Sequence, residues 1–149
     1  MVLMLPILIP YNWISQRARC FYYLFCVLTI GALTSMAKLF YHEARPFWVS
    51  DDVSAYACSN QYGNPSGHCF TTVGVVLTIW FDYNSVALSS TDTWFRQGYS
   101  RLCFLGWGLV FAGAIVYSRL FLGVHSLNQV LFGSLLGIWF AITAHFLIR

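Results

Sequence analysis

Three cations and two histidines in this sequence could together do chemistry on an anion. Lys38 and Arg45 are seven residues apart, about two helical turns, so both side chains would leave one face of a helix that continued. His68, Arg119 and His125 follow later in the chain. Two guanidiniums and an ammonium can bind a phosphate dianion. Two histidines beside a phosphoryl group permit hydrolysis, because one imidazole can attack phosphorus while the other protonates the leaving oxygen.

The Pro-Ser-Gly step before His68 predicts the start of a helix. Such a start leaves several backbone N–H groups unpaired, with Ser66 placed to cap the helix or to donate a hydrogen bond. These N–H groups and the helix dipole attract anions, so Ser66 and Gly67 are candidate phosphate ligands.

A second helix boundary is expected near Gly123. Arg119 and His125 would not share a face of one continuous helix, so a break between them is needed to bring them together. His125 and Gln129 are four residues apart and should stack on one face of the helix that follows.

The amino-acid composition indicates the class of protein that must position these residues. Of 149 residues, 58% are hydrophobic and 9% are charged, against about 45–50% and about 25% in globular proteins. Eight Lys/Arg and five Asp/Glu cannot cover a water-soluble surface, and a net charge of +3 is too sparse to track nucleic-acid phosphates. The five cysteines form no CxxC pair and suggest no zinc site. The sequence therefore predicts a membrane protein.

We expect an all-α, polytopic transmembrane bundle that forms a single membrane domain over residues 1–149. A span needs about 20 mostly apolar residues. A short apolar segment, 1–14, has no signal-peptide pattern and is interpreted as a half-span, an interfacial helix or the remnant of a longer upstream region. A reactive loop is expected over 42–67 and a solvated polar loop over 84–101. The four expected full spans are about 20–41, 68–83, 102–121 and 126–148.

Charge asymmetry orients these spans. Five arginines fall on one side, which the positive-inside rule makes cytoplasmic: Arg17, Arg19, Arg96, Arg101 and Arg149. The remaining cations and three of the four histidines fall on the opposite side. An active site on the non-cytoplasmic face is therefore predicted.

Three motifs resemble, in order, those of the type-2 phosphatidic acid phosphatase superfamily, which includes lipid phosphate phosphatases and glucose-6-phosphatase. They are Lys38-x6-Arg45-Pro46, Pro65-Ser66-Gly67-His68 and Ser118-Arg119-x5-His125. The resemblance implies a helical bundle and metal-independent hydrolysis of a phosphomonoester through a phosphohistidine, with no cofactor.

The resemblance also implies residue roles. His125 would be the nucleophile and His68 the general acid. Gln129 stands where the motif usually carries an aspartate that holds the other ring nitrogen of the nucleophile, although the glucose-6-phosphatase branch tolerates Gln there. A neutral amide can fix the tautomer but stabilises imidazolium only weakly. The implied phosphate ligands are Lys38, Arg45, Ser66, Gly67 and Arg119.

The superfamily commonly has six spans, so the first two would be missing here, replaced by 1–14 or supplied by a protein partner. We expect a lipid phosphate rather than a sugar phosphate as substrate, since an amphiphile can approach sideways from the bilayer; a prenyl or dolichyl diphosphate fits the same site. No metal is expected, because Asp51-Asp52 is the only acidic pair. The alternative is a non-catalytic relative that serves as a structural or lipid-binding subunit of a membrane assembly, with a vanadate-dependent haloperoxidase as a third possibility.

Overall fold

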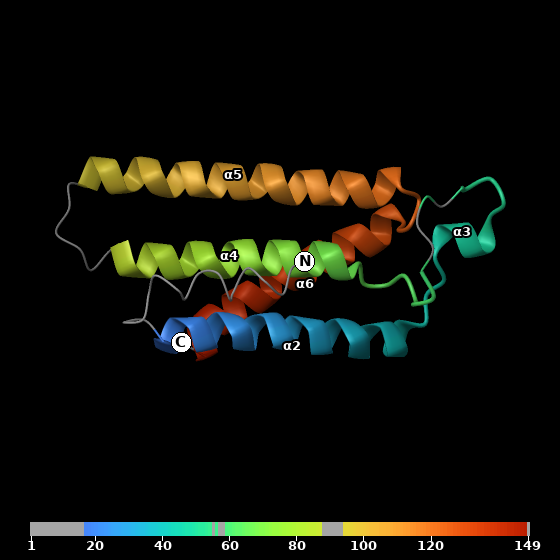
Figure 1. Cartoon of the computed structure of the whole chain (residues 1–149), viewed down its shortest axis with the longest axis horizontal. Helices are drawn as coiled ribbons and strands as arrows, with labels where there is room; N and C mark the ends of the chain where they lie inside the picture. The colour runs from blue at the N-terminus through green and yellow to red at the C-terminus, as the bar shows by residue number, and fades with distance from the viewer. Residues whose placement is uncertain (1–16, 55, 57–58, 88–93, 149) are drawn as a thin grey trace.

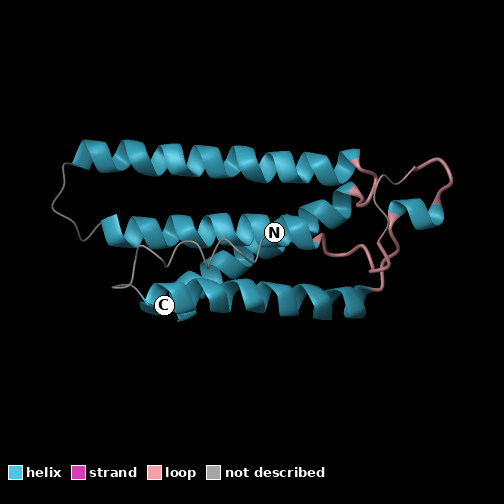
Figure 2. Ribbon diagram, in the orientation of Figure 1, coloured by secondary structure: helices cyan, strands magenta, loops and turns pink. Residues whose placement is uncertain are grey.

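The computed structural model describes residues 17–54, 56, 59–87 and 94–148, and it contains no strand within them. Figure 1 and Figure 2 show long helices lying side by side, with the described loops at the end of the bundle that carries the helix labelled α3. The short apolar segment expected at 1–14 lies outside the described residues. The helices are α2 (Arg17–Tyr41), α3 (Pro46–Val49), α4 (Gly67–Ala87), α5 (Trp94–Phe121), α6 (Leu127–Thr143) and a terminal π-helix, η4 (Ala144–Ile148).

Helix α4 is the centre of the bundle, because α2, α5 and α6 all pack against it. In Figure 1, α4 lies between α5 and α2, and α6 runs obliquely from the C-terminal end of α5 to the N-terminal end of α2. Consequently α2 and α5 end where α4 and α6 begin. Four helix termini from distant parts of the sequence meet at this end of the molecule, together with α3.

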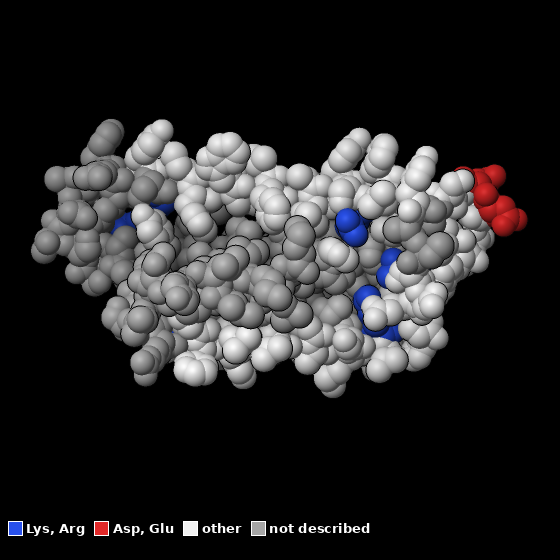
Figure 3. Space-filling model, viewed as in Figure 1, with Lys and Arg blue, Asp and Glu red and all other residues white. Residues whose placement is uncertain are grey.

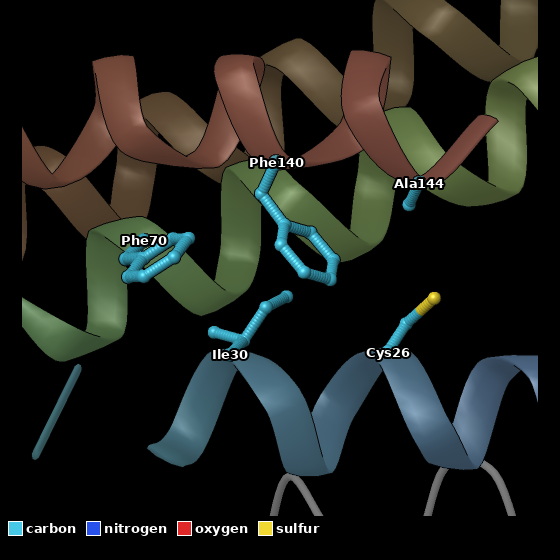
Figure 4. Packing of buried hydrophobic residues seen from close by; sticks show 5 residues of the cluster. All are labelled: Cys26, Ile30, Phe70, Phe140 and Ala144. Atoms are coloured by element: carbon cyan, nitrogen blue, oxygen red, sulfur yellow. The ribbon is translucent and has the colours of Figure 1, made fainter. Parts of the chain in front are cut away.

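The buried apolar core joins α2, α4 and α6. Figure 4 shows Ile30 and Cys26 of α2 facing Phe140 and Ala144 from the C-terminal segment, with Phe70 of α4 beside them. The rings of Phe70 and Phe140 are 6.2 Å apart and nearly perpendicular, a favourable edge-to-face geometry. Many large apolar side chains outside this core are exposed in the isolated chain, as expected of surfaces that face lipid.

Two glycines of α6 bring that helix close to α4. A Cβ on Gly133 would lie 2.6 Å from the carbonyl oxygen of Ser66, and one on Gly137 would lie 2.9 Å from the backbone nitrogen of Gly74. Small residues at this spacing let helix backbones approach closely. The GxxxG step therefore packs helices within one chain.

Three of the four expected spans are confirmed as helices long and apolar enough to cross a membrane. These segments are Ala18–Val49, Arg101–Phe121 and Leu127–Ile148. Helix α4 has 21 residues but is not among these three segments, and it buries the polar side chains of Thr78 and Asp82. The central position of α4 explains this composition, since its neighbours are helices rather than lipid alone. The count of four full spans is thus confirmed only in part, and the crossing by α4 stays a prediction.

The polar segment expected as a loop over 84–101 is largely helical. Helix α4 continues to Ala87 and α5 already begins at Trp94. Asn84 and Ser85 fit inside a helix because their side chains donate to the carbonyls of Trp80 and Phe81, four residues earlier. Within the expected reactive loop, Pro46 starts the short helix α3, consistent with the preference of proline for the first helical position.

Candidate active site

The predicted cations and histidines come from the ends of five helices that the fold brings together. Lys38 lies in the last turn of α2, His68 in the first turn of α4 and Arg119 in the last turn of α5. His125 precedes α6, and Arg45 precedes α3. Figure 3 shows Lys and Arg atoms gathered near the α3 end of the molecule. The predicted convergence at one end of the bundle is therefore present.

Gln61 holds two of the cations. The ammonium of Lys38 donates to the side-chain Oε1 of Gln61 at 2.9 Å, and Nε of Arg45 donates to the backbone carbonyl of Gln61 at 2.7 Å. Nη1 of Arg45 donates to the carbonyl of Val124 at 2.9 Å. These contacts place the guanidinium of Arg45 beside the residue that precedes His125.

The expected reason for the proximity of Lys38 and Arg45 was wrong. Helix α2 ends at Tyr41, and Arg45 has an extended backbone with φ −79° and ψ 153°. The two side chains therefore do not leave one face of a continuous helix. The chain turns after α2, and the buried Arg45 side chain reaches across to the α5–α6 connection.

Neutral groups hold all three cations. Nε and Nη2 of Arg119 each lie 3.2 Å from the hydroxyl oxygen of Ser118. None of Lys38, Arg45 and Arg119 has a carboxylate partner in the part of the chain that the structure describes. No described carboxylate therefore neutralises their positive charge, an arrangement that suits the binding of an anion.

His68 is exposed and, among the described residues, has no hydrogen-bond partner. Arg119, Lys38 and Arg45 all lie within electrostatic range of its imidazole. An exposed imidazole near three cations is placed where it could contact an anion that they attract.

His125 is only 5% exposed, and a backbone turn at Gly123 positions it. Gly123 has φ +65°, and a Cβ there would lie 3.2 Å from the carbonyl oxygen of Ser54. The predicted helix break near Gly123 is thus confirmed, and both its conformation and its close packing favour glycine.

Burial lowers the pKa of His125 from 6.5 to about 4, and the positive charges of Arg45 and Lys38 act in the same direction. A hydrogen bond with Gln129 and one with the backbone of Gly63 oppose the shift. His125 is therefore a neutral imidazole at physiological pH, the form that can act as a nucleophile.

Gln129 connects His125 to the start of α6. Its Oε1 lies 3.2 Å from Nδ1 of His125 and accepts from the backbone N–H of Ser126 at 3.3 Å. Ser126 caps α6 in return by accepting from the backbone N–H of Gln129. This reciprocal pattern is a capping box. The Ser-x-x-Gln spacing is visible in the sequence, so it could have predicted this role of Gln129.

A carboxylate that the sequence analysis missed lies behind Gln129. Nε2 of Gln129 donates to Oε1 of Glu43 at 3.1 Å and to the carbonyl of Ala44 at 2.9 Å. The other carboxylate oxygen of Glu43 accepts from Nδ2 of Asn64 at 2.6 Å. The only signal in the sequence was the place of Glu43 between two motif cations. Gln61 was also missed, because a glutamine in a loop gives no pattern.

Two further predicted ligands, Ser66 and Gly67, lie at the start of α4. Ser66 is fully buried, and its hydroxyl donates to the sulfur of Cys69 at 3.3 Å, a weak acceptor. The backbone N–H of Ser66 donates to the carbonyl of Gln129 at 3.1 Å. Ser66 thus ties α4 to α6 here, while Gly67 lies at the N-terminus, where backbone N–H groups lack helical partners. Their roles as phosphate ligands stay predictions.

In the described parts of the chain, no three His, Cys, Asp or Glu side chains gather in a group that could hold a metal ion. The acidic pair Asp51-Asp52 is exposed. Independence from metal remains a prediction.

The three apolar helices indicate an integral membrane protein, and the cations of Lys38, Arg45 and Arg119 lie at one end of its bundle. The chain matches the PAP2 superfamily over residues 19–148 and belongs to that family. Its members are generally phosphatases, so membership suggests phosphatase-type activity. No curated protein and no solved structure matches the chain.

Proposed function

We propose that this protein is a metal-independent membrane phosphatase that hydrolyses a phosphomonoester, preferably a lipid phosphate, through a phosphohistidine on His125. The observation that carries the proposal is the set of three cations, held by neutral acceptors, around one exposed and one buried histidine. A phosphate dianion would supply the missing negative charge.

The hydrogen bonds of Gln129 support His125 as the nucleophile. An amide oxygen can only accept, so Nδ1 of His125 must carry the proton in the contact with Oε1 of Gln129. In a neutral imidazole, Nε2 then keeps its lone pair. Nε2 attacks phosphorus and the ester P–O bond breaks. The leaving oxygen takes a proton from His68, whose protonated form the bound phosphate dianion stabilises, and an alcohol is released.

Hydrolysis of the phosphohistidine uses the same groups in reverse. His68, now neutral, takes a proton from a water molecule as the water oxygen attacks phosphorus. The P–N bond to His125 breaks, so inorganic phosphate is released and both imidazoles return to their starting state. Lys38, Arg45 and Arg119 stabilise the equatorial oxygens in both transition states.

Exposed aromatic side chains favour a lipid substrate. Phe40 and Tyr41 lie at the end of α2 and Tyr117 and Phe121 at the end of α5, all exposed and all at the same end of the bundle as the cations. Aromatic residues prefer the membrane–water interface. A site at this depth is accessible to a phosphate group on a lipid that stays in the bilayer. By the charge asymmetry of the loops, this is the non-cytoplasmic face.

The test is a substrate panel with EDTA present, in which release of inorganic phosphate is measured from a lipid phosphate, a sugar phosphate and a prenyl diphosphate. We expect hydrolysis of the lipid phosphate by the wild type and none above background by His125→Ala. His145→Phe is the matched control, because His145 stacks on Phe81 and lies in η4, beyond the C-terminal end of α6 and away from the site.

Acid-labile, base-stable incorporation of labelled phosphate into the wild type but not into His125→Ala would support the covalent step. Activity that survives in His125→Ala, or that requires added Mg²⁺, would contradict the proposal. A wild type with neither hydrolysis nor phosphate incorporation would favour the alternative, a non-catalytic subunit of a membrane assembly.

A further inference from the structure

Glu43 is the one carboxylate that hydrogen bonds connect to His125 among the described residues. Its two carboxylate oxygens accept from the side-chain amides of Gln129 and Asn64, and its backbone carbonyl accepts from the N–H of Gly63 at 2.8 Å. Both side-chain partners are neutral. The negative charge of Glu43 is therefore not consumed in an ion pair with the cations of the site.

The contacts around Gln129 fix which end of its amide faces His125. Nε2 faces two acceptors, the carboxylate of Glu43 and the carbonyl of Ala44, whereas Oε1 faces the N–H of Ser126. If the amide were reversed, Oε1 would face both acceptors and Nε2 would face the N–H donor, so none of these hydrogen bonds could form. Glu43 is the charged member of this set, and charge-assisted hydrogen bonds are the stronger ones.

Close packing also prevents the amide from turning away. Gln129 is 1% exposed, and a Cβ on Gly63 would lie 2.5 Å from its Oε1. The amide is thus enclosed between Gly63 and the segment that carries Glu43. A negative charge placed behind the amide polarises it, which strengthens the oxygen that faces the imidazole as an acceptor.

We infer that Glu43 is a positioning residue that acts on His125 through Gln129. It orients the amide so that Nδ1 of His125 carries the proton. It also supplies a negative charge that is separated from His125 by the side chain of Gln129. The inference rests on the proposed function, and it deepens it: the negative charge that a carboxylate at position 129 would provide comes from a different segment of the chain.

The experiment separates the charge of Glu43 from its hydrogen bonds. Glu43→Gln removes the charge but can keep both contacts, since Oδ1 of Asn64 is buried without a partner and a rotated Asn64 amide could accept from the new side chain. Glu43→Ala removes charge and contacts together. Asp51→Asn is the matched control, because it removes an exposed carboxylate from the same connection between α2 and α4.

Two readouts are used on the full chain in one detergent. The first is kcat and KM on the phosphate monoester that the wild type hydrolyses. The second is the ¹⁵N chemical shifts of the His125 ring, assigned by difference from His125→Gln, which report which nitrogen carries the proton whether or not the protein is active.

We expect Glu43→Gln to lower kcat about tenfold and Glu43→Ala about a hundredfold, with KM within about twofold, in the range seen when groups behind a catalytic histidine are removed. Asp51→Asn should equal the wild type. The ¹⁵N shifts should show one Nδ1–H tautomer in the wild type and in Glu43→Gln, and a mixture in Glu43→Ala.

Wild-type kcat in Glu43→Gln, or an unchanged single tautomer in Glu43→Ala, would overturn the inference. Failure of the proposed function has a different signature, namely no hydrolysis by the wild type. In that case the ¹⁵N shifts alone decide: a tautomer mixture that appears only in Glu43→Ala supports the positioning role, and an unchanged tautomer overturns it.

Discussion

The two ends of the bundle differ in how their charged side chains are partnered: one end holds an ion pair, and the other holds cations bonded to neutral groups. At the end away from the site, Asp82 of α4 is 5% exposed, accepts from the hydroxyl of Tyr23 and lies 3.6 Å from Nε of Arg19, both on α2. This carboxylate and cation neutralise each other and join two helices. Because each ion has an opposite charge beside it, the pair leaves little field to attract a ligand.

At the site end, the cations and the carboxylate are kept apart. Lys38 and Arg45 are held by the oxygens of Gln61 and Val124, while Glu43 is held by amide N–H groups. Holding ions with neutral groups costs more than pairing them, so such an arrangement indicates function rather than stability. In the proposed function, this difference leaves the ordered cations without a countercharge of the protein, so that the phosphate group of the substrate can supply it.

The largest expected effect comes from removing the buried cation at the site end. Arg45→Met should lower kcat/KM by about 10³-fold, since the guanidinium both stabilises transition-state charge and ties Gln61 to Val124. The assay is steady-state hydrolysis by the purified protein. Arg19→Met, at the other end, should leave kcat/KM of the folded fraction within about threefold. Equal losses in both variants would refute the contrast between the ends.

The next effect concerns stability instead of rate. Asp82→Ala leaves the hydroxyl of Tyr23 and the guanidinium of Arg19 without this acceptor, so the free energy of unfolding should fall by about 2–3 kcal/mol. Thermal unfolding in detergent measures it, with Asp51→Ala as the exposed control. The folded Asp82→Ala protein should keep wild-type KM. A fall in kcat/KM of the folded Asp82→Ala protein as large as that in Arg45→Met would show that the two ends are not independent.

Much of the site could be predicted because helix geometry alone brings the motifs together. A helix start at Gly67, a break at Gly123 and four antiparallel helices place Lys38, His68 and His125 at one end. These features follow from local rules about proline, glycine and hydrophobic length. The structure confirms them to within a few residues at the site end.

The remainder depended on contacts between distant segments, which local rules cannot supply. Glu43 and Gln129 are 86 residues apart in the chain, and nothing in the composition around Glu43 marks it as a partner. The same-face expectation for Lys38 and Arg45 was wrong because the helix ends at Tyr41, where the span was expected to end, so Arg45 lies beyond it in extended backbone. Helix α4 was expected to be a full span because of its length alone. Its buried polar residues are explained by its central position among the other helices, which the sequence did not show.

A smaller effect should follow from crowding the α4–α6 contact beside the site. Gly133→Ala would place a Cβ 2.6 Å from the carbonyl oxygen of Ser66, which is backbone and can only move with its turn. We expect a loss of about 1–2 kcal/mol in the free energy of unfolding, with reduced kcat because Ser66 also bonds the carbonyl of Gln129. Gly113→Ala in α5 is the control, since its Cβ would meet nothing within 4 Å. Equal behaviour of the two variants would argue against close packing at Gly133.

The smallest expected effect is that of pH on His125. Its pKa is lowered to about 4, chiefly by burial and further by Arg45 and Lys38, so the imidazole should stay neutral and nucleophilic down to about pH 5. An ordinary histidine would be mostly protonated at that pH. The ¹⁵N shifts of the His125 ring, followed between pH 8 and pH 5, should show no midpoint in this range for the wild type. Because Arg45 contributes to the shift, Arg45→Met should bring the midpoint upward toward 6.5. A wild-type midpoint near 6.5 would mean that the site end does not hold its nucleophile in a buried, cationic environment, and the contrast with the ion-paired end would then lose its basis.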